Sequence, residues 1–495
     1  MSTGELKTVA WLFLVYFVAY SFEINNFNIS IDDEFLAYSP RSTFVEIGRW
    51  VHPLVRESLW PQPVSPAGPY IIFGICVCLG YLYSLRAFGV EKFEFFHFGS
   101  FAAFILLPVW SSQLEFSANI IPLGIAMVSA SAAVLLTVSS IDGRRAKNAG
   151  RLIIAAVLLA VTAGAYQSAI LVFPVLMIGV LLRQRLMPAD RRAADFLVPL
   201  CISSGVLVVS IGIYLLVSTA VMRGYGIQPS AYGQHFVHPD VLFAHPRTVL
   251  RDVLHDLRGV YFSWWTAFGA ARYVFSWTLI AGLAVSLYPA RNSIAKATLA
   301  AASLLAMVAL PAAFTILAGG GLPLRTLVAT PSVFLMVMLL FHHSTQFRAI
   351  RQLAGAAVIL VALQGLYIQS MYQARTNLVQ KQDLLTAAAL NSDILRVVET
   401  TGVEPIRVDF RGYRRSVSIY PLVPTTTSGA SFFEWDDGNS YRMVRYMNLI
   451  GFHRYVSIDL EERERIRSNY RAMPSWPAPG SVKLLNDVVL VKLSD

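Results

Sequence analysis

Residues Leu6–Phe22 read LKTVAWLFLVYFVAYSF, an apolar run that ends just before Glu23. A helix rises about 1.5 Å per residue, so this run crosses most of the roughly 30 Å hydrocarbon core of a bilayer. Three adjacent carboxylates, Asp32-Asp33-Glu34, follow about ten residues later. This order predicts a membrane helix that leads directly into an acidic loop.

The composition extends this interpretation to most of the chain. Of 495 residues, 55% are hydrophobic and only 14% are charged, whereas soluble domains carry about 25% charged residues. The chain is therefore expected to be an α-helical multi-pass membrane protein. The formal net charge of +10 comes largely from short segments between apolar runs, so it is weak support for nucleic-acid binding.

Eleven apolar segments are candidate membrane-spanning helices. The pair on either side of Tyr166-Gln167-Ser168 is short, and its members either tilt or dip partway and return. The segments are Leu6–Phe22, Tyr70–Leu85, Phe96–Trp110, Ile120–Val138, Leu152–Ala165, Ile170–Leu182, Leu197–Val221, Tyr273–Leu287, Ala297–Leu317, Leu327–Phe341 and Leu353–Gln373.

The placement of Lys and Arg predicts the orientation. If Lys7 is cytoplasmic, the short basic loops, such as Arg86–Lys92 and Arg183–Arg192, all fall on the cytoplasmic side. The odd number of spans then puts the C-terminus outside. Two long loops, 23–69 and 222–272, also lie outside, and connections that only join helices do not need such length or charge.

The chain becomes polar after about residue 375. Ile406–Phe410 and Val488–Leu493 have the pattern of strands, and Asn439–Ile450 and Glu461–Met473 that of helices. We therefore expect a transmembrane domain over residues 1–375 and a small extracytoplasmic α/β domain over residues 376–495.

The acidic triplet allows two interpretations. It is either the solvated start of a loop that caps the helix beginning near Glu34, or a site where carboxylates close to hydrocarbon are used chemically. In the second case the carboxylates can also hold a divalent cation, Mg²⁺ or Mn²⁺, together with a donor phosphate. Helical spacing of Phe44, Ile47 and Val51 further predicts an interfacial helix that ends before Pro53.

Two charges at the outer ends of spans, Glu115 and Arg325, either snorkel to the interface or bind substrate. Arg325 is the stronger binding candidate, because it opposes the positive-inside trend and follows Gly319-Gly320-Gly321. A fixed guanidinium group binds phosphate oxygens with two parallel hydrogen bonds. Further candidate substrate-binding residues on the same side are Arg49, Tyr166, Gln167 and Arg258.

No motif assigns a metal site or nucleotide chemistry. The spacing of His235, His238, His245 and His255 matches no recognised zinc motif, so we assign no metal ligands. A Gly-rich phosphate loop, a dinucleotide fingerprint and a Ser-His-Asp pattern are absent from the sequence.

The strings Ile31-Asp32-Asp33-Glu34, Tyr166-Gln167-Ser168 and Pro323-Leu324-Arg325, with many spans and an outer C-terminal domain, resemble the GT-C class of membrane glycosyltransferases. Within that class the chain is most similar to the GtrII-type O-antigen glucosyltransferases. The resemblance implies a GT-C-like catalytic domain over residues 1–375. It also implies transfer of a sugar, commonly glucose, from undecaprenyl phosphate to lipopolysaccharide O-antigen on the periplasmic side of the bacterial inner membrane.

The chemistry of such a transfer suggests catalytic roles for the three carboxylates of the acidic triplet. Lipid phosphate is already a good leaving group, so the reaction needs a base for the acceptor hydroxyl and cations for the departing phosphate. Asp33 or Asp32 is the candidate base, and the other aspartate and Glu34 orient the acceptor or a metal. Direct displacement inverts the anomeric centre.

A transporter or lipid-linked-sugar flippase is the alternative function. Such proteins use charges inside the membrane and often two repeated halves. The spans of this chain are nearly free of charge, no halves match, and the polar groups gather on one face. The sequence therefore favours the transferase.

Overall fold

The computed structural model describes residues 2–141, 145–188, 192, 194–230, 239–263, 273–291, 293–343, 347–398, 405–420, 427, 429–452 and 455–495. The chain forms two compact units. The helical unit comprises Met1–Phe27, Pro40–Leu114 and Ala118–Gln369, and the C-terminal unit comprises Asn28–Ser39, Glu115–Ser117 and Ser370–Asp495. The acidic triplet and Glu115 therefore belong to the same unit as the C-terminal segment.

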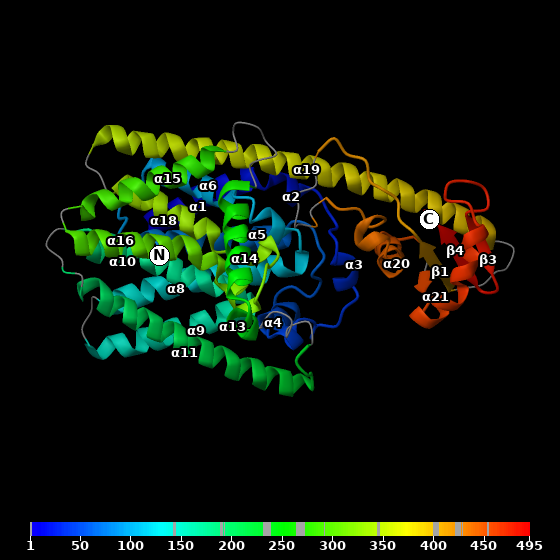
Figure 1. Ribbon diagram of the computed structural model, residues 1–495, viewed down its shortest axis with the longest axis horizontal. Coiled ribbons are helices and arrows are strands. Elements are labelled where there is room, and N and C mark those ends of the chain that lie inside the picture. Colours follow the sequence, from blue (N-terminus) through cyan, green and yellow to red (C-terminus); the bar gives the residue numbers. More distant parts are fainter. Residues whose placement is uncertain are drawn as a thin grey trace. The chain divides into compact units, whose positions relative to one another are not determined.

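The helical unit is built from long helices (Figure 1), several of which are strongly apolar. Each of the eleven predicted segments overlaps a helix. These helices are α1 (Thr3–Ala19), α5 (Gly68–Phe88), α6 (Phe95–Ile105), α8 (Ser117–Ile141), α9 (Arg145–Ala165), α10 (Val172–Leu181), α11 (Ala194–Tyr225), α15 (Tyr273–Leu287), α16 (Ile294–Ala309), α18 (Thr330–His343) and α19 (Arg348–Val398).

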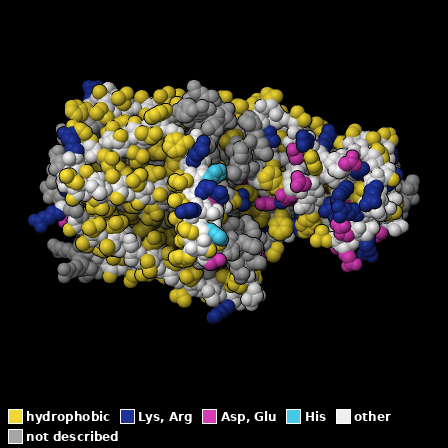
Figure 2. Space-filling view, in the orientation of Figure 1, with side chains coloured by type: hydrophobic (Ala, Val, Ile, Leu, Met, Phe, Trp, Pro, Cys, Tyr) yellow, Lys and Arg dark blue, Asp and Glu magenta, His cyan; other side chains and the backbone are white. Residues whose placement is uncertain are grey.

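Within the described residues, seven helices are long and apolar enough to cross a membrane, and three further apolar helices are shorter. Hydrophobic side chains cover most of the visible face of the helical unit, whereas acidic and basic side chains gather over the C-terminal unit (Figure 2). A hydrophobic surface of this extent needs a hydrocarbon environment. The expectation of a multi-pass helical membrane protein is therefore confirmed, without fixing the number of crossings.

Shorter helices connect the long ones in the helical unit. They are α2 (Ser21–Asn25), α4 (Val51–Ser58), α7 (Ser111–Leu114), α13 (Pro239–Ala244), α14 (Pro246–Arg258) and α17 (Ala313–Ala318), with the 3-10 turns η1 (Val45–Ile47), η2 (Gln167–Leu171) and η8 (Leu324–Thr326).

The predicted interfacial helix before Pro53 is wrong in its position. The helix there is α4, which begins at Val51 and contains Pro53 within its first turn. Proline is tolerated in that turn because the first N–H groups of a helix have no partner inside the helix. The residues before Val51 form only the short turn η1, which lies between Phe44 and Gly48, both with positive φ.

The C-terminal unit contains a four-stranded sheet in the order β2-β1-β4-β3. Its strands are β1 (Ile406–Arg411), β2 (Tyr455–Ser457), β3 (Val482–Leu485) and β4 (Val488–Lys492). β2, β1 and β4 are parallel, and β3 pairs antiparallel with β4. The two predicted strands correspond to β1 and β4, and β4 is buried along its length, as expected of a central parallel strand.

Helices that accompany this sheet include the end of α19, α20 (Ser440–Leu449) and α21 (Leu460–Ile466). α19 continues without a break from the apolar segment to Val398, and its buried Leu390 and Ile394 join the core of the sheet. Met443 and Met447 of α20 enter the same core, as does Ile31 from the first loop. The burial of Ile31 fixes the residue immediately before the acidic triplet.

Candidate active site

Asp33 is held at the start of the short helix α3 (Asp33–Leu36). Its side chain is fully buried, and its oxygens accept hydrogen bonds from the Ser30 amide at 3.0 Å and from the Ser117 hydroxyl at 3.0 Å. The Ser117 amide lies 3.3 Å from the second carboxylate oxygen. Burial raises the pKa of Asp33 to about 7, although these donors oppose the shift.

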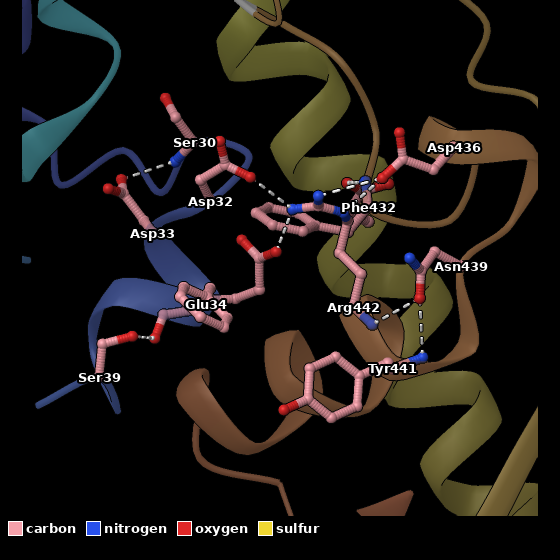
Figure 3. A network of polar contacts seen from close by, with 12 residues as sticks. Ser30, Asp32, Asp33, Glu34, Ser39, Phe432, Asp436, Asn439, Tyr441 and Arg442 are labelled. Atoms are coloured by element: carbon pink, nitrogen blue, oxygen red, sulfur yellow. Dashed lines mark hydrogen bonds and ion pairs between the residues drawn. The ribbon is translucent and has the colours of Figure 1, made fainter. Parts of the chain in front are cut away.

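Arg442 of α20 is the centre of the network that contains the other two carboxylates (Figure 3). It makes an ion pair with buried Glu34, another with Asp32 at 3.1 Å and a third with Asp436 at 3.1 Å. Burial raises the pKa of Glu34 to about 7, despite the opposing charge of Arg442. All of these residues belong to the C-terminal unit.

The three carboxylates differ in their access to solvent. Asp33 and Glu34 are almost completely buried, whereas the Asp32 side chain is 48% exposed. Asp32 also has a φ of 82°, an unusual value for a residue with a side chain. Strained backbone of this kind concentrates at functional sites. Asp32 thus combines an accessible side chain with a strained backbone, whereas Asp33 combines a buried side chain with a raised pKa.

A second polar cluster lies in the helical unit and contains Arg49, Tyr166 and Gln167. The Nε of Arg49 donates to Gln167 Oε1 at 2.9 Å, and its guanidinium carbon lies 4.4 Å from the centre of the Tyr166 ring. Gln167 also donates to the carbonyl of Ile47 at 2.6 Å. The arrangement holds a guanidinium group in a fixed position by a hydrogen bond and a cation–π contact.

Arg325 joins the second cluster through its main chain. Its carbonyl oxygen accepts from Gln113 Nε2 and from the Tyr166 hydroxyl, the latter at 3.3 Å. Gln113 Nε2 also contacts the Tyr166 hydroxyl at 2.7 Å. Buried Gln113 thus ties the turn that carries Arg325 to Tyr166, whose ring contacts the Arg49 guanidinium group, so the Arg325 backbone belongs to the same cluster as the Arg49 side chain.

Two predicted binding residues lie elsewhere. Glu115 belongs to the C-terminal unit and is buried. Arg258 is exposed at the end of α14, and among the described residues it makes no hydrogen bond or ion pair with the Arg49 cluster.

The described residues hold no group of three or more His, Cys, Asp or Glu side chains arranged to bind a metal ion. The triplet does not fit a cation in this arrangement, because Asp33 is bonded to serine donors and Asp32 and Glu34 to a guanidinium group. His235 and His238 lie outside the described residues.

Sequence reasoning missed Arg442 and Asp436. Arg442 is one of 40 Lys and Arg residues and follows no motif. Only the helix that carries it, Asn439–Ile450, was predicted, and the pairing of Arg442 with Asp32 spans 410 residues of sequence.

A comparison with protein-family models matches residues 21–342 to the family described as Glucosyl transferase GtrII. The matched range contains the acidic triplet, Arg49, Tyr166-Gln167 and Arg325, and ends before Arg442 and the sheet. Neither the curated proteins nor the solved structures contain a match.

Proposed function

Because this chain belongs to the GtrII glucosyltransferase family, we propose that it transfers a sugar, most simply glucose, from a polyprenyl-phosphate donor to a glycan hydroxyl. The donor is undecaprenyl phosphate carrying the sugar, and the acceptor is an O-antigen or a similar glycan of lipopolysaccharide. The basic-loop alternation supports a periplasmic active site in the bacterial inner membrane, with a cytoplasmic N-terminus and a periplasmic C-terminal domain. Membership of a transferase family argues against the transporter and flippase alternative.

The observation that carries the mechanism is a buried carboxylate whose pKa is raised to about 7, held beside an arginine-paired carboxylate. A general base works best when its pKa lies near the operating pH. We assign this role to Asp33. The Ser117 hydroxyl now donates to Asp33, and the acceptor hydroxyl takes its place in the reactive complex.

The bond changes are those of a direct displacement. The acceptor oxygen attacks the anomeric carbon while its proton passes to Asp33. The bond between the anomeric carbon and the phosphate oxygen breaks, and the lipid phosphate leaves with the electron pair. Attack from the opposite side inverts the anomeric centre. Asp32 is exposed and orients the acceptor, and Arg442 fixes Asp32 and Glu34.

The departing phosphate needs positive charge that does not have to reorganise during the reaction. Arg49 and Arg325 are the proposed source, because Tyr166 contacts the Arg49 side chain and the Arg325 backbone. Gln167 positions Arg49 through its side-chain oxygen. Glu115 and Arg258 remain proposed contributors to substrate binding.

The proposal is tested with the full chain reconstituted in lipid nanodiscs. The protein receives labelled undecaprenyl-phosphate glucose and O-antigen acceptor, and transfer is measured for wild type and Asp33→Asn. We expect transfer by wild type and loss of at least a hundredfold in the variant, which is the usual contribution of a general base. Absence of transfer with every polyprenyl-phosphate sugar offered would overturn the proposed donor class.

A further inference from the structure

The C-terminal unit contains a cleft of about 1050 Å³ at the carboxyl ends of β1 and β2. Arg411 at the end of β1 and Ser457 at the end of β2 both line it, and the first residues of α20 and α21 complete its walls. The carboxyl ends of parallel strands are where α/β sheets bind ligands. The volume lies at the upper limit of about 300–1,000 Å³ for small-molecule pockets, so it admits a ligand larger than one sugar.

One wall of the cleft is a strained turn at Asp436-Asp437-Gly438. All three residues have positive φ, at 55°, 53° and 86°. A Cβ added at Gly438 would lie 2.0 Å from the carbonyl oxygen of Gly412, so only glycine permits this close approach of two backbone segments. The packing of Gly438 against the end of β1 therefore holds two aspartates at the rim of the cleft.

The charges of the cleft argue against an anionic ligand. Five carboxylates line it and outnumber the three guanidinium groups. The carboxylates are those of Asp409, Asp436, Asp437, Asp459 and Glu464. A phosphate or uronate would meet a net negative lining.

Most of the cleft's charges are already bonded within the protein. Asp409 accepts from the Tyr470 hydroxyl at 2.8 Å and pairs with Arg463 at 3.0 Å, and Glu464 pairs with Arg467 at 3.2 Å. Among the described residues, the side chains of Asp437 and Arg411 make no hydrogen bond or ion pair. Asp437 therefore offers acceptor oxygens and Arg411 offers N–H donors. A sugar hydroxyl can bond to either group, because it both donates and accepts hydrogen bonds.

The cleft is connected to the acidic triplet inside the same unit. Asp436 lines the cleft and pairs with Arg442, and Arg442 pairs with Asp32 and Glu34 (Figure 3). One guanidinium group thus links the rim of the cleft to Glu34 and to Asp32, to which we assign the orientation of the acceptor.

We propose that this cleft is the acceptor subsite and that it binds several residues of a neutral, polyhydroxylated glycan. This inference rests on the proposed function and adds to it the place and the charge of the acceptor. The matched family region ends at residue 342, so the subsite lies outside it.

The test compares a cleft variant with a matched control. Asp437→Asn/Arg411→Ala removes the negative charge of one unbonded side chain and the whole guanidinium group of the other. Asp437→Asn alone keeps the turn intact because asparagine tolerates positive φ. The control is Arg396→Ala, which removes an exposed arginine of the same unit. Arg396 pairs with Asp393 at 3.2 Å and lies outside the cleft lining. KM for a neutral O-antigen oligosaccharide is expected to rise about tenfold to a hundredfold in the double variant. The donor KM and the kcat of the double variant are expected to stay close to wild type. Arg396→Ala is expected to change neither acceptor KM, donor KM nor kcat.

Direct binding separates this inference from the proposed function. The unlabelled neutral oligosaccharide is titrated into the full chain without donor, and a phosphorylated oligosaccharide of the same length is titrated in parallel. Binding of the neutral glycan that weakens in Asp437→Asn supports the subsite even where no transfer occurs, in which case the proposed function alone fails. Tighter binding of the phosphorylated glycan, or wild-type acceptor KM in an active double variant, overturns the subsite and leaves the transferase intact.

Discussion

Arg442 lies 3.1 Å from Asp32 although 410 residues of sequence separate them. The same guanidinium group pairs with Glu34, whose side chain is 2% exposed. Removing one partner of a buried ion pair leaves an uncompensated charge, which costs about 3–5 kcal/mol. The first loop and α20 are therefore joined by an interaction whose loss is expected to lower the stability of the C-terminal unit.

Arg442→Met should lower the thermal stability of the C-terminal unit, because Glu34 then remains buried without a counter-charge. Glu34→Gln combined with Arg442→Met should recover much of that loss, since the double variant buries no charge at this position. The measurement is thermal unfolding followed by near-ultraviolet circular dichroism. Equal destabilisation in the single and double variants would contradict a coupling between the two residues.

Asp33→Asn and Asp32→Asn should separate the roles of the two aspartates. Asp33→Asn keeps the shape of the buried side chain but removes the proton acceptor, so kcat should fall a hundredfold or more. Asp32→Asn should act mainly on acceptor KM, because Asp32 is exposed and orients rather than accepts a proton in our assignment. A larger fall in kcat for Asp32→Asn than for Asp33→Asn would exchange the two assignments.

The pH dependence of kcat/KM follows from the raised pKa of Asp33 and Glu34, both at about 7. A base must be ionised, so activity should be low below pH 6 and rise with pH through about 7 as the carboxylate pair loses a proton. Ser117 stabilises the ionised form by its hydrogen bonds. Ser117→Ala should therefore raise the pKa further and move the acidic limb of the profile to higher pH.

A pH titration of wild type beside Ser117→Ala measures both effects with the same substrates. Thr137→Ala is a suitable control, because among the described residues its hydroxyl bonds only to the Ala133 carbonyl of its own helix. An acidic limb near pH 4 in the wild type would show that neither buried carboxylate is the base.

The sequence predicted the positions of the apolar helices well, because each is specified locally by a run of hydrophobic residues. It also identified strands β1 and β4 from their short apolar patterns. The start of α4 was misplaced, because Pro53 was taken as a helix end although proline is tolerated in the first turn.

The candidate site was predictable only in part. Asp32-Asp33-Glu34 is conspicuous in the sequence because its three charges stand together near a span. Arg442 and Asp436 lie in a polar segment where charged residues are ordinary, and the pairing of Arg442 with Asp32, 410 residues away in sequence, depends on the fold of the C-terminal unit. Pairings at such separation in sequence carry no periodicity that a local pattern can reveal.

The last prediction concerns the donor phosphate and the cluster around Tyr166. Arg49 is held by Gln167 and by the Tyr166 ring, and the Arg325 carbonyl is held by Gln113 and Tyr166. If these guanidinium groups bind the phosphate with two hydrogen bonds each, a lysine cannot replace them, because its ammonium group is a point charge. Arg49→Lys and Arg325→Lys should both raise donor KM about tenfold or more, with a smaller fall in kcat as charge develops on the leaving phosphate.

The control for both variants is Arg247→Lys, since Arg247 is exposed on α14 in the same unit and should leave donor kinetics unchanged. The Arg49 variant should also lose its hydrogen bond to Gln167, so Gln167→Leu should reproduce part of its defect without removing any charge. A residue that only anchors the chain at the interface would tolerate lysine. Wild-type donor KM in both lysine variants would therefore reduce Arg49 and Arg325 to anchors and place the phosphate elsewhere.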